Sequence, residues 1–145
     1  MLTNNNYKIT SIMKKFLVLL SFLMICGTSF SNDILKWQAT SLAYKTVDDW
    51  GNWSSWSDWE DVSVLIVINT VTDRVNIYSS TPQEYDVYDT EPREYDNEGG
   101  SSITFHCIDA NGLRCDMRIR VQANGQVQLY VDYNDIMFVY NVQSK

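Results

Sequence analysis

The stretch FHCIDANGLRCDMRIRVQANGQVQLYVDY, residues 105–133, decides the fold of this chain. Apolar and polar residues alternate through it with a period of two. One face carries Leu113, Cys115, Met117, Ile119 and Val121, and the other carries Arg114, Asp116, Arg118, Arg120 and Gln122. The alternation returns in Val127, Leu129, Val131 and Tyr133. Such a period predicts antiparallel strands with one face buried and the other in water.

Two turns within this stretch set the register of its strands. They are Ala110-Asn111-Gly112 and Ala123-Asn124-Gly125. A three-residue loop that ends in glycine usually forms a type I turn followed by a bulge, with the glycine in the left-handed conformation. This geometry predicts three directly opposed pairs: Cys107 with Cys115, Ile119 with Leu129, and Met117 with Val131.

The same reading extends in both directions from residues 105–133. Further strands are expected at 34–46, 62–68, 75–77 and 83–89, with Leu35, Trp37 and Ala39 facing inward from the first. The last hairpin turns at Asn134-Asp135, which should bring Phe138 opposite Val131 and Tyr140 opposite Leu129. About eight strands joined by short turns predict an all-β antiparallel meander that closes into a small barrel, with a β-sandwich as the alternative. We favour the barrel because closure removes exposed strand edges.

Length and charge limit the classes of protein to consider. The chain has 145 residues, of which 45% are hydrophobic and 20% charged, so we expect one folded domain and not a disordered chain. Its net charge is -7, with only 11 lysines and arginines. This balance argues against nucleic acid as a partner, because a phosphate backbone requires a clustered basic face.

The first 31 residues have the pattern of a signal peptide. Met13-Lys14-Lys15 is a basic segment, residues 16–25 are apolar except for one serine, and small residues precede a cut after Ser31. Residues 1–12 are either an extra N-terminal extension or lie before a true start at Met13. A lipoprotein anchor at Cys26, a buried apolar helix and an uncleaved anchor are the alternatives. We therefore expect residues 32–145 to be a single β domain, periplasmic or secreted, with no membrane attachment after cleavage.

Cleavage would leave two cysteines and a more acidic domain. The mature chain would carry eight basic against 18 acidic residues, a net charge of -10. An even pair of cysteines in an exported protein indicates a disulfide. Because the predicted register sets Cys107 opposite Cys115, we expect the disulfide to join these two residues across the hairpin.

Three stretches resemble the small exported bacterial β-barrel proteins of calycin or lipocalin type. They are Trp56-Ser57-Asp58-Trp59, Ile77-Tyr78-Ser79 and Gln128-Leu129-Tyr130-Val131-Asp132-Tyr133. The resemblance covers the mature chain and implies its architecture only. Lipocalins open with a Gly-x-Trp motif, whereas Gly51-Asn52-Trp53 follows the first predicted strand here. That departure argues against a ligand inside the barrel, and no functional residue is carried over.

A run of tryptophans is the first candidate binding feature. Trp50, Trp53, Trp56 and Trp59 recur every three residues. The spacing resembles the WxxWxxW run of thrombospondin type 1 repeats, but the cysteines that join those repeats are missing. In an extended chain this spacing sends successive rings to opposite faces, which allows two to enter the core and two to face water. Exposed indoles would stack on sugars or peptides; the alternative is a hydrophobic plug at one end of the barrel.

An acidic segment is the second candidate. Residues 84–98 contain seven carboxylates together with Tyr85, Tyr88 and Tyr95. They would suit Ca²⁺ or a basic partner, although no EF-hand spacing is present. The alternative is a solvated, flexible loop. We add Tyr85 and Tyr88 to the tryptophans as candidate binding residues.

His106 is expected opposite Asp116 on the outer face. A His-Asp pair is half of a general-base arrangement, but the sequence offers no nucleophile in a recognisable motif, and one histidine does not make a zinc site. We therefore expect a surface cross-strand pair, with no catalytic residue, no cofactor and no metal.

The sequence favours an exported, non-enzymatic binding protein over other classes. Its ligand would be a glycan, a peptide or a small amphipathic molecule, recognised by the Trp-rich surface. The main alternative is an acidic inhibitor or interaction protein that caps a basic extracellular or periplasmic enzyme, and a hydrolase is the remaining one. Leu65, Val67, Met137 and Val139 fall on outward positions, which allows a second packed layer, so both monomer and dimer stay open.

Overall fold

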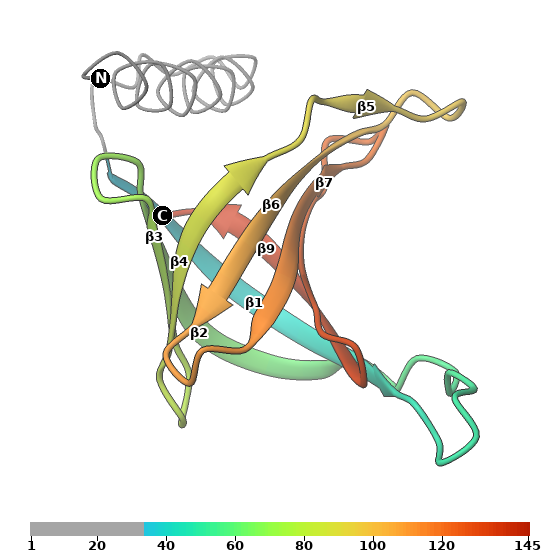
Figure 1. Ribbon diagram of the computed structural model, residues 1–145. Coiled ribbons are helices and arrows are strands. Elements are labelled where there is room, and N and C mark those ends of the chain that lie inside the picture. The colour runs from blue at the N-terminus through green and yellow to red at the C-terminus, as the bar shows by residue number, and fades with distance from the viewer. Residues whose placement is uncertain (1–33) are drawn as a thin grey trace, which may run out of the picture.

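The computed structural model describes residues 34–145, and all of its regular structure is antiparallel β (Figure 1). The signal peptide predicted at 1–31 lies outside the described residues. The nine strands are β1 (Ile34–Thr46), β2 (Glu60–Asn69), β3 (Arg74–Tyr78), β4 (Gln83–Thr90), β5 (Glu94–Tyr95), β6 (Ser101–Asp109), β7 (Arg114–Val121), β8 (Val127–Asp132) and β9 (Ile136–Ser144).

Eight of the strands form a closed barrel. Neighbours along the chain pair with one another from β1 to β4 and from β6 to β9. Pairing of β1 with β9 and of β4 with β6 completes the ring, while the two-residue β5 pairs only with the start of β6. The predicted all-β meander and its closure into a barrel are confirmed, and the sandwich alternative does not apply.

The register predicted from the two Asn-Gly turns is also confirmed. Cys107 pairs with Cys115, Ile119 with Leu129 and Met117 with Val131, and β9 places Tyr140 opposite Leu129 and Phe138 opposite Val131. In the first turn the Asp109 amide donates to the Leu113 carbonyl at 2.9 Å. Gly112 and Gly125 have φ angles of 81° and 85°, the left-handed conformation that a three-residue loop requires.

The alternating residues fill the barrel with aliphatic side chains. Leu35, Trp37 and Ala39 of β1 face inward as predicted, and Ile119, Leu129 and Val131 are at most 1% exposed. A cavity lined by residues such as Ile68, Phe105 and Met117 measures about 10 Å³ and has no polar lining. That volume is at the lower limit for a single water molecule, so this level of the barrel has no room for a ligand.

Leu113 was placed on the inward face, and that prediction is wrong. Leu113 is 57% exposed to solvent. Leu113 follows Gly112 in the bulge at the end of the turn, where two residues oppose Asp109 alone. The alternation therefore starts one pair later, at Cys115.

The predicted disulfide is the second correction. Cys107 and Cys115 are opposed and buried, but both are free thiols. The bond between Asp109 and Leu113 marks a hydrogen-bonded pair, and such pairs recur at every second residue. Cys107 and Cys115 are therefore also a hydrogen-bonded pair, and the structure leaves both thiols free. The hydrogen bond with Cys115, together with burial, raises the pKa of the Cys107 thiol and keeps it unreactive.

A bulge in β1 determines which residues reach the outer wall. The pairing of β1 shifts between Ala39 and Ser41 on both of its neighbours. Before the bulge, odd-numbered residues face inward; beyond it Leu42 packs on the core, so Ala43 and Lys45 face outward. This reversal places Lys45 on the outside, beside the segment that follows β1.

Candidate functional site

The four candidate tryptophans lie on one long connection between β1 and β2. Residues 47–59, here called the Trp loop, project from the barrel at the end of β1 (Figure 1). All four side chains are exposed: Trp50 by 86%, Trp53 by 37%, Trp56 by 41% and Trp59 by 49%. The interpretation of these residues as a hydrophobic plug, and the expectation that two of them enter the core, are therefore wrong.

The tip of the Trp loop is held by Asp48. One carboxylate oxygen, Oδ1, accepts hydrogen bonds from the amides of Trp50 at 2.9 Å and Asn52 at 2.8 Å. The Asp48 carbonyl accepts from the Gly51 amide at 3.0 Å, and Gly51 has a φ of 85°. The bonds from Asn52, above all, lower the pKa of Asp48. The tip is thus an ordered turn that holds Trp50 out in solvent.

The returning half of the Trp loop follows β1 with a period of three. The amide of Ser54 donates to the Thr46 carbonyl and that of Ser57 to the Tyr44 carbonyl, both at 2.8 Å. Both serine hydroxyls also accept hydrogen bonds from β1 amides. A chain that repeats every three residues, as in a polyproline-type conformation, puts i and i+3 on one side. The serines consequently face β1, and Trp53 and Trp56 share another side.

Lys45 and Arg118 alternate with the aromatic rings on the outer wall. The Lys45 ammonium lies 5.1 Å from the Trp53 ring centre and 5.0 Å from that of Trp56. Trp56 meets Tyr130 edge-on, with ring centres 6.2 Å apart, and the Arg118 guanidinium lies 4.3 Å from the Tyr130 ring. We call these five residues the cation–aromatic ladder. It fixes the Trp loop to the wall of the barrel and keeps the indoles in defined positions.

The ladder also explains two buried residues that lie outside the barrel interior. Ala43 and Val139 pair on the outer wall and are 1% and 3% exposed. Val139 also pairs with Tyr130, which contacts Trp56, and Ala43 lies two residues before Lys45. The burial of Ala43 and Val139 therefore coincides with the part of the outer wall where the ladder lies.

Next to the ladder lies a row of polar side chains on β7 and β8. Arg118 bonds to Asp132 and Arg120 to Asp96, both at 3.3 Å. Gln128 is 7% exposed and makes two hydrogen bonds: its Oε1 accepts from the Tyr130 hydroxyl at 3.0 Å, and its Nε2 donates to Asn141 at 3.0 Å. We call Arg118, Arg120, Gln128, Tyr130 and Asp132 the outer strip. Burial raises the pKa of Asp132.

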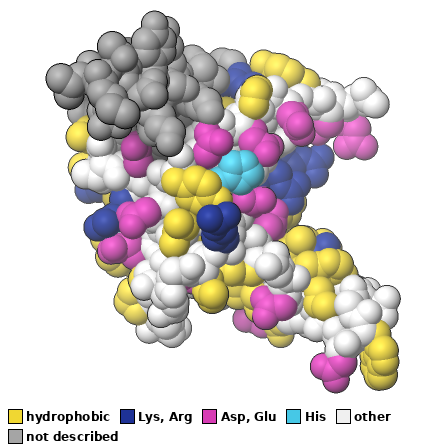
Figure 2. All heavy atoms as spheres, in the orientation of Figure 1, with side chains coloured by type: hydrophobic (Ala, Val, Ile, Leu, Met, Phe, Trp, Pro, Cys, Tyr) yellow, Lys and Arg dark blue, Asp and Glu magenta, His cyan; other side chains and the backbone are white. Residues whose placement is uncertain are grey.

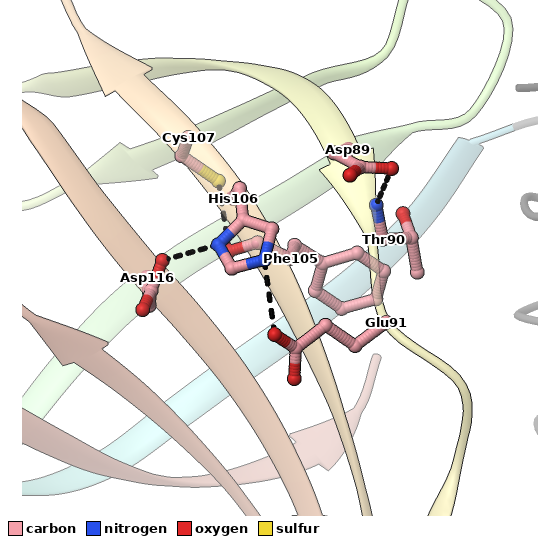
Figure 3. Close-up of polar contacts among 7 residues, drawn as sticks. All are labelled: Asp89, Thr90, Glu91, Phe105, His106, Cys107 and Asp116. Carbon is pink, nitrogen blue, oxygen red and sulfur yellow. Dashed lines mark hydrogen bonds and ion pairs between the residues drawn. The ribbon is translucent and has the colours of Figure 1, made fainter.

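His106 lies between two carboxylates on the same wall (Figure 3). Its Nδ1 is 2.7 Å from Asp116 and its Nε2 is 3.1 Å from Glu91. The ring of Tyr88 stacks on His106 with centres 6.1 Å apart. The hydrogen bond to Asp116, supported by the charges of both carboxylates, raises the pKa of His106. The predicted pair of His106 with Asp116 is present, and Glu91 is the partner that the sequence did not indicate.

The acidic segment 84–98 is largely ordered strand and ion pair. Arg74 bonds to Glu84 at 3.3 Å and to Asp86 at 2.9 Å, and Asp96 accepts hydrogen bonds from the turn before β6. The interpretation as a flexible loop is therefore wrong for most of its length. Within residues 34–145, no group of three or more potential ligands is placed to hold a metal ion.

The two candidate tyrosines of this segment have different positions. Tyr88 is 45% exposed beside His106, whereas Tyr85 is 1% exposed in the barrel, with its hydroxyl 2.5 Å from Gln83. Successive side chains of a strand point to opposite faces of the sheet, so Tyr85 and Tyr88 do not share a face. A bulge lies between Val87 and Asp89, at Tyr88. Tyr85 is therefore removed from the candidate binding surface.

Sequence reasoning missed Lys45, Tyr130 and Arg118 as parts of the site. A signal for two of them was present, since the register that pairs Ile119 with Leu129 also pairs Arg118 with Tyr130. No comparable signal existed for Lys45, because its outward position depends on the bulge in β1. The contact of Lys45 with two tryptophans follows from the path of the Trp loop.

Comparisons with known proteins add no assignment. No protein-family model, no curated protein and no solved structure matches the chain. In the part of the chain from residue 34 onward, no helix is long and apolar enough to span a membrane. Because a fold by itself does not define an activity, the residues of the site are what indicate the function.

Proposed function

We propose that the protein is a non-enzymatic binding protein that recognises a glycan, a peptide or a small amphipathic ligand through its Trp-rich surface. The exposure of all four tryptophans of the Trp loop is the observation that carries this proposal. Burying a large apolar side chain stabilises a fold by about 1.5–3 kcal/mol, yet Trp50 stays almost fully exposed and the other three keep 37–49% of their surface in solvent. Clustered, exposed and ordered indoles are typical of ligand-binding surfaces.

The histidine site does not favour the hydrolase alternative. Both ring nitrogens of His106 are occupied by carboxylates, Asp116 and Glu91. Neither nitrogen is left to accept a proton from a nucleophile, as a general base must. The pattern fits a surface charge cluster that joins β4, β6 and β7.

The test is a titration followed by tryptophan fluorescence. Soluble glycans, short peptides and amphiphiles would be added to the exported protein, with Trp56→Phe and Trp53→Phe as variants. Trp37 is buried in the barrel and serves as an internal reference. We expect at least one class to shift the emission of the wild type, with a weaker response in both variants. No response from any class would contradict the proposal.

The second candidate function is that of an acidic interaction protein that caps a basic enzyme. The exposed Trp50 on an ordered tip, beside Asp48 and Asp49, favours it, since preorganised tryptophans are common anchors of protein interfaces. Binding to a cationic lysozyme would be measured at low and at physiological salt, for the wild type and for Trp50→Ala. Binding of the wild type that persists at physiological salt, and that is lost in the Trp50→Ala variant, would support this function. Binding that disappears in salt would reflect unspecific charge attraction.

A periplasmic or secreted location remains part of the proposal. It rests on the signal-peptide pattern of residues 1–31 and on a cut after Ser31. Sequencing of the exported protein should find Asn32 at the N-terminus. A lipid on Cys26 would instead place the protein at a membrane surface.

A further inference from the structure

We propose that the ligand is an elongated, uncharged saccharide chain, and that its site continues from the Trp loop along the outer strip to a polar hollow beside β5. This inference rests on the proposed binding function and specifies its ligand and its extent. Three features support this inference. They are the aromatic rings of Trp53 and Trp56, the paired charges of the outer strip, and the polar hollow at the end of the strip nearest β5.

The aromatic end supplies apolar ring faces in fixed positions. Trp53 and Trp56 are 37% and 41% exposed, although both contact Lys45. Their contacts with β1 and with the ladder mean that little ordering is required when a ligand binds, which favours affinity. The apolar faces of sugar rings suit flat indole surfaces, which offer a large contact area with few rotatable bonds.

The floor of the site suits hydroxyl groups better than charges. Arg118 is paired with Asp132 and Arg120 with Asp96, so neither arginine presents an uncompensated charge to an ionic ligand. Gln128, held by Tyr130 and Asn141, adds an oriented amide. Such a surface favours an uncharged molecule rich in hydroxyls.

The far end of the strip opens into a polar hollow. A cavity of about 190 Å³ is lined by Asp96, Glu98, Arg120, Gln122, Ala123 and Asn124. It is much larger than the apolar cavity of about 10 Å³ in the barrel. Arg120 belongs both to this hollow and to the strip, so the two are continuous. In Figure 2 the outline of the molecule is hollowed between the arm that carries β5 and the Trp loop.

The length of the outer strip and the pairing of its strands on both sides favour a saccharide chain over other ligands. From Asp132 to Gln128 the strip covers four residue steps, or about 13 Å of strand; Trp56 flanks it at Tyr130, and the hollow extends it beyond Arg120. A small amphiphile would occupy one end only. A peptide usually adds to a free strand edge, but β7 and β8 are each paired on both sides. A saccharide chain needs no free edge and can contact both ends.

The experiment compares ligands of increasing length on variants at the two ends of the site. The exported protein would be titrated with neutral gluco-oligosaccharides from the disaccharide upward, with neutral soluble polysaccharides, and with a polyuronate of similar size. The variants are Trp56→Ala at the aromatic end and Arg120→Gln at the hollow. Arg74→Gln is the matched control, because Arg74 is also an exposed arginine paired with carboxylates, but on β3. Thermal melting would verify that each variant is folded.

We expect affinity to rise with the length of the neutral chain. Trp56→Ala should weaken binding at least tenfold for every length, and Arg120→Gln should weaken the longer chains several-fold while leaving the shortest unchanged. Arg74→Gln should bind like the wild type. Equal behaviour of Arg120→Gln and Arg74→Gln would confine the site to the Trp loop and overturn the inference, while the proposed function would stand. Binding of peptide, amphiphile or polyuronate in place of neutral chains would overturn the ligand class alone, and no binding at all would overturn both proposals.

Discussion

The two faces of β7 and β8 show how one stretch of chain serves two purposes. The inward residues, such as Ile119 and Leu129, are aliphatic and 1% exposed. The outward residues of the same strands form the outer strip, in which Arg118 contacts Tyr130 and Tyr130 contacts Trp56 of the Trp loop. Aliphatic burial inside stabilises the barrel, whereas the directed contacts outside contribute little free energy but fix the geometry of a surface. We therefore expect inner substitutions to change stability and outer ones to change recognition.

Substitutions at Ile119 and Arg120, which are neighbours in sequence, test the difference between the two faces most strongly. Ile119→Asp places an unpaired carboxylate in the barrel, at a cost of several kcal/mol against a total stability of about 5–15 kcal/mol, so the protein should unfold. Arg120→Gln removes one exposed ion pair and should cost about 0–1 kcal/mol. Thermal melting measures both. Similar losses would mean that the assigned faces of β7 are wrong.

The next effect concerns two glycines with the same backbone conformation. Gly112 and Gly51 have φ angles of 81° and 85°, and a Cβ at either position would meet open space. Valine resists this conformation, so Gly112→Val should cost about 1–2 kcal/mol by backbone strain alone. Gly51→Val should lower the melting temperature less, because the tip of the Trp loop can rearrange without opening the barrel. Urea unfolding of both variants checks the difference, and a larger loss at Gly51 would mean that the loop contributes to the stability of the barrel.

A smaller effect is expected from the cation–aromatic ladder. Lys45→Met keeps the length of the side chain but removes the charge next to Trp53 and Trp56, which should cost about 0.5–1 kcal/mol. Tryptophan emission should change because two indoles lose their cationic neighbour. Lys36→Met on the same strand is the control and should leave the emission as it is in the wild type. An unchanged spectrum in Lys45→Met would show that the contact does not persist in solution.

The smallest effect is a dependence of stability on pH. Asp116 and Glu91 favour the protonated form of His106, so its pKa in the folded chain lies above 6.5, the ordinary value. The resulting stabilisation is present in full below about pH 6.5 and is lost as the pH rises through the folded pKa. Melting temperatures of the wild type and His106→Gln, measured across this range, should converge as the pH rises. A constant difference would exclude a charged His106.

Much of the barrel could be predicted because local signals agreed. Alternation assigned the inward residues, two Asn-Gly turns fixed the pairs from Cys107–Cys115 to Ile119–Leu129, and the Asn134-Asp135 turn fixed Leu129–Tyr140. Both signals depend on a few neighbouring residues, whose geometry the local backbone determines. The prediction was wrong at Leu113, where a bulge interrupts the alternation, and the structure has free thiols at Cys107 and Cys115 where a disulfide was expected.

The site was predicted less well because it combines segments that are distant in sequence. The sequence identifies the tryptophans as candidates. An extended strand with a period of two, however, would place some of their rings in the core and others in solvent. The serines that bond to β1 impose a period of three on the returning segment instead. The sequence offers Tyr85 as a candidate binding residue, but the pairing of β4 with β3 and β6 places it in the barrel.

The sequence by itself determined the class of fold, the register of the central hairpins and the residues that fill the barrel, because alternation and turn chemistry act over a few residues. The tertiary structure alone decided that Lys45 lies between Trp53 and Trp56, and that Arg118 and Trp56 meet on Tyr130. Those contacts depend on a bulge in β1, on the path of a long loop and on closure of the ring. The outer surface is therefore a property of the closed barrel, since only the paired strands hold its side chains next to one another.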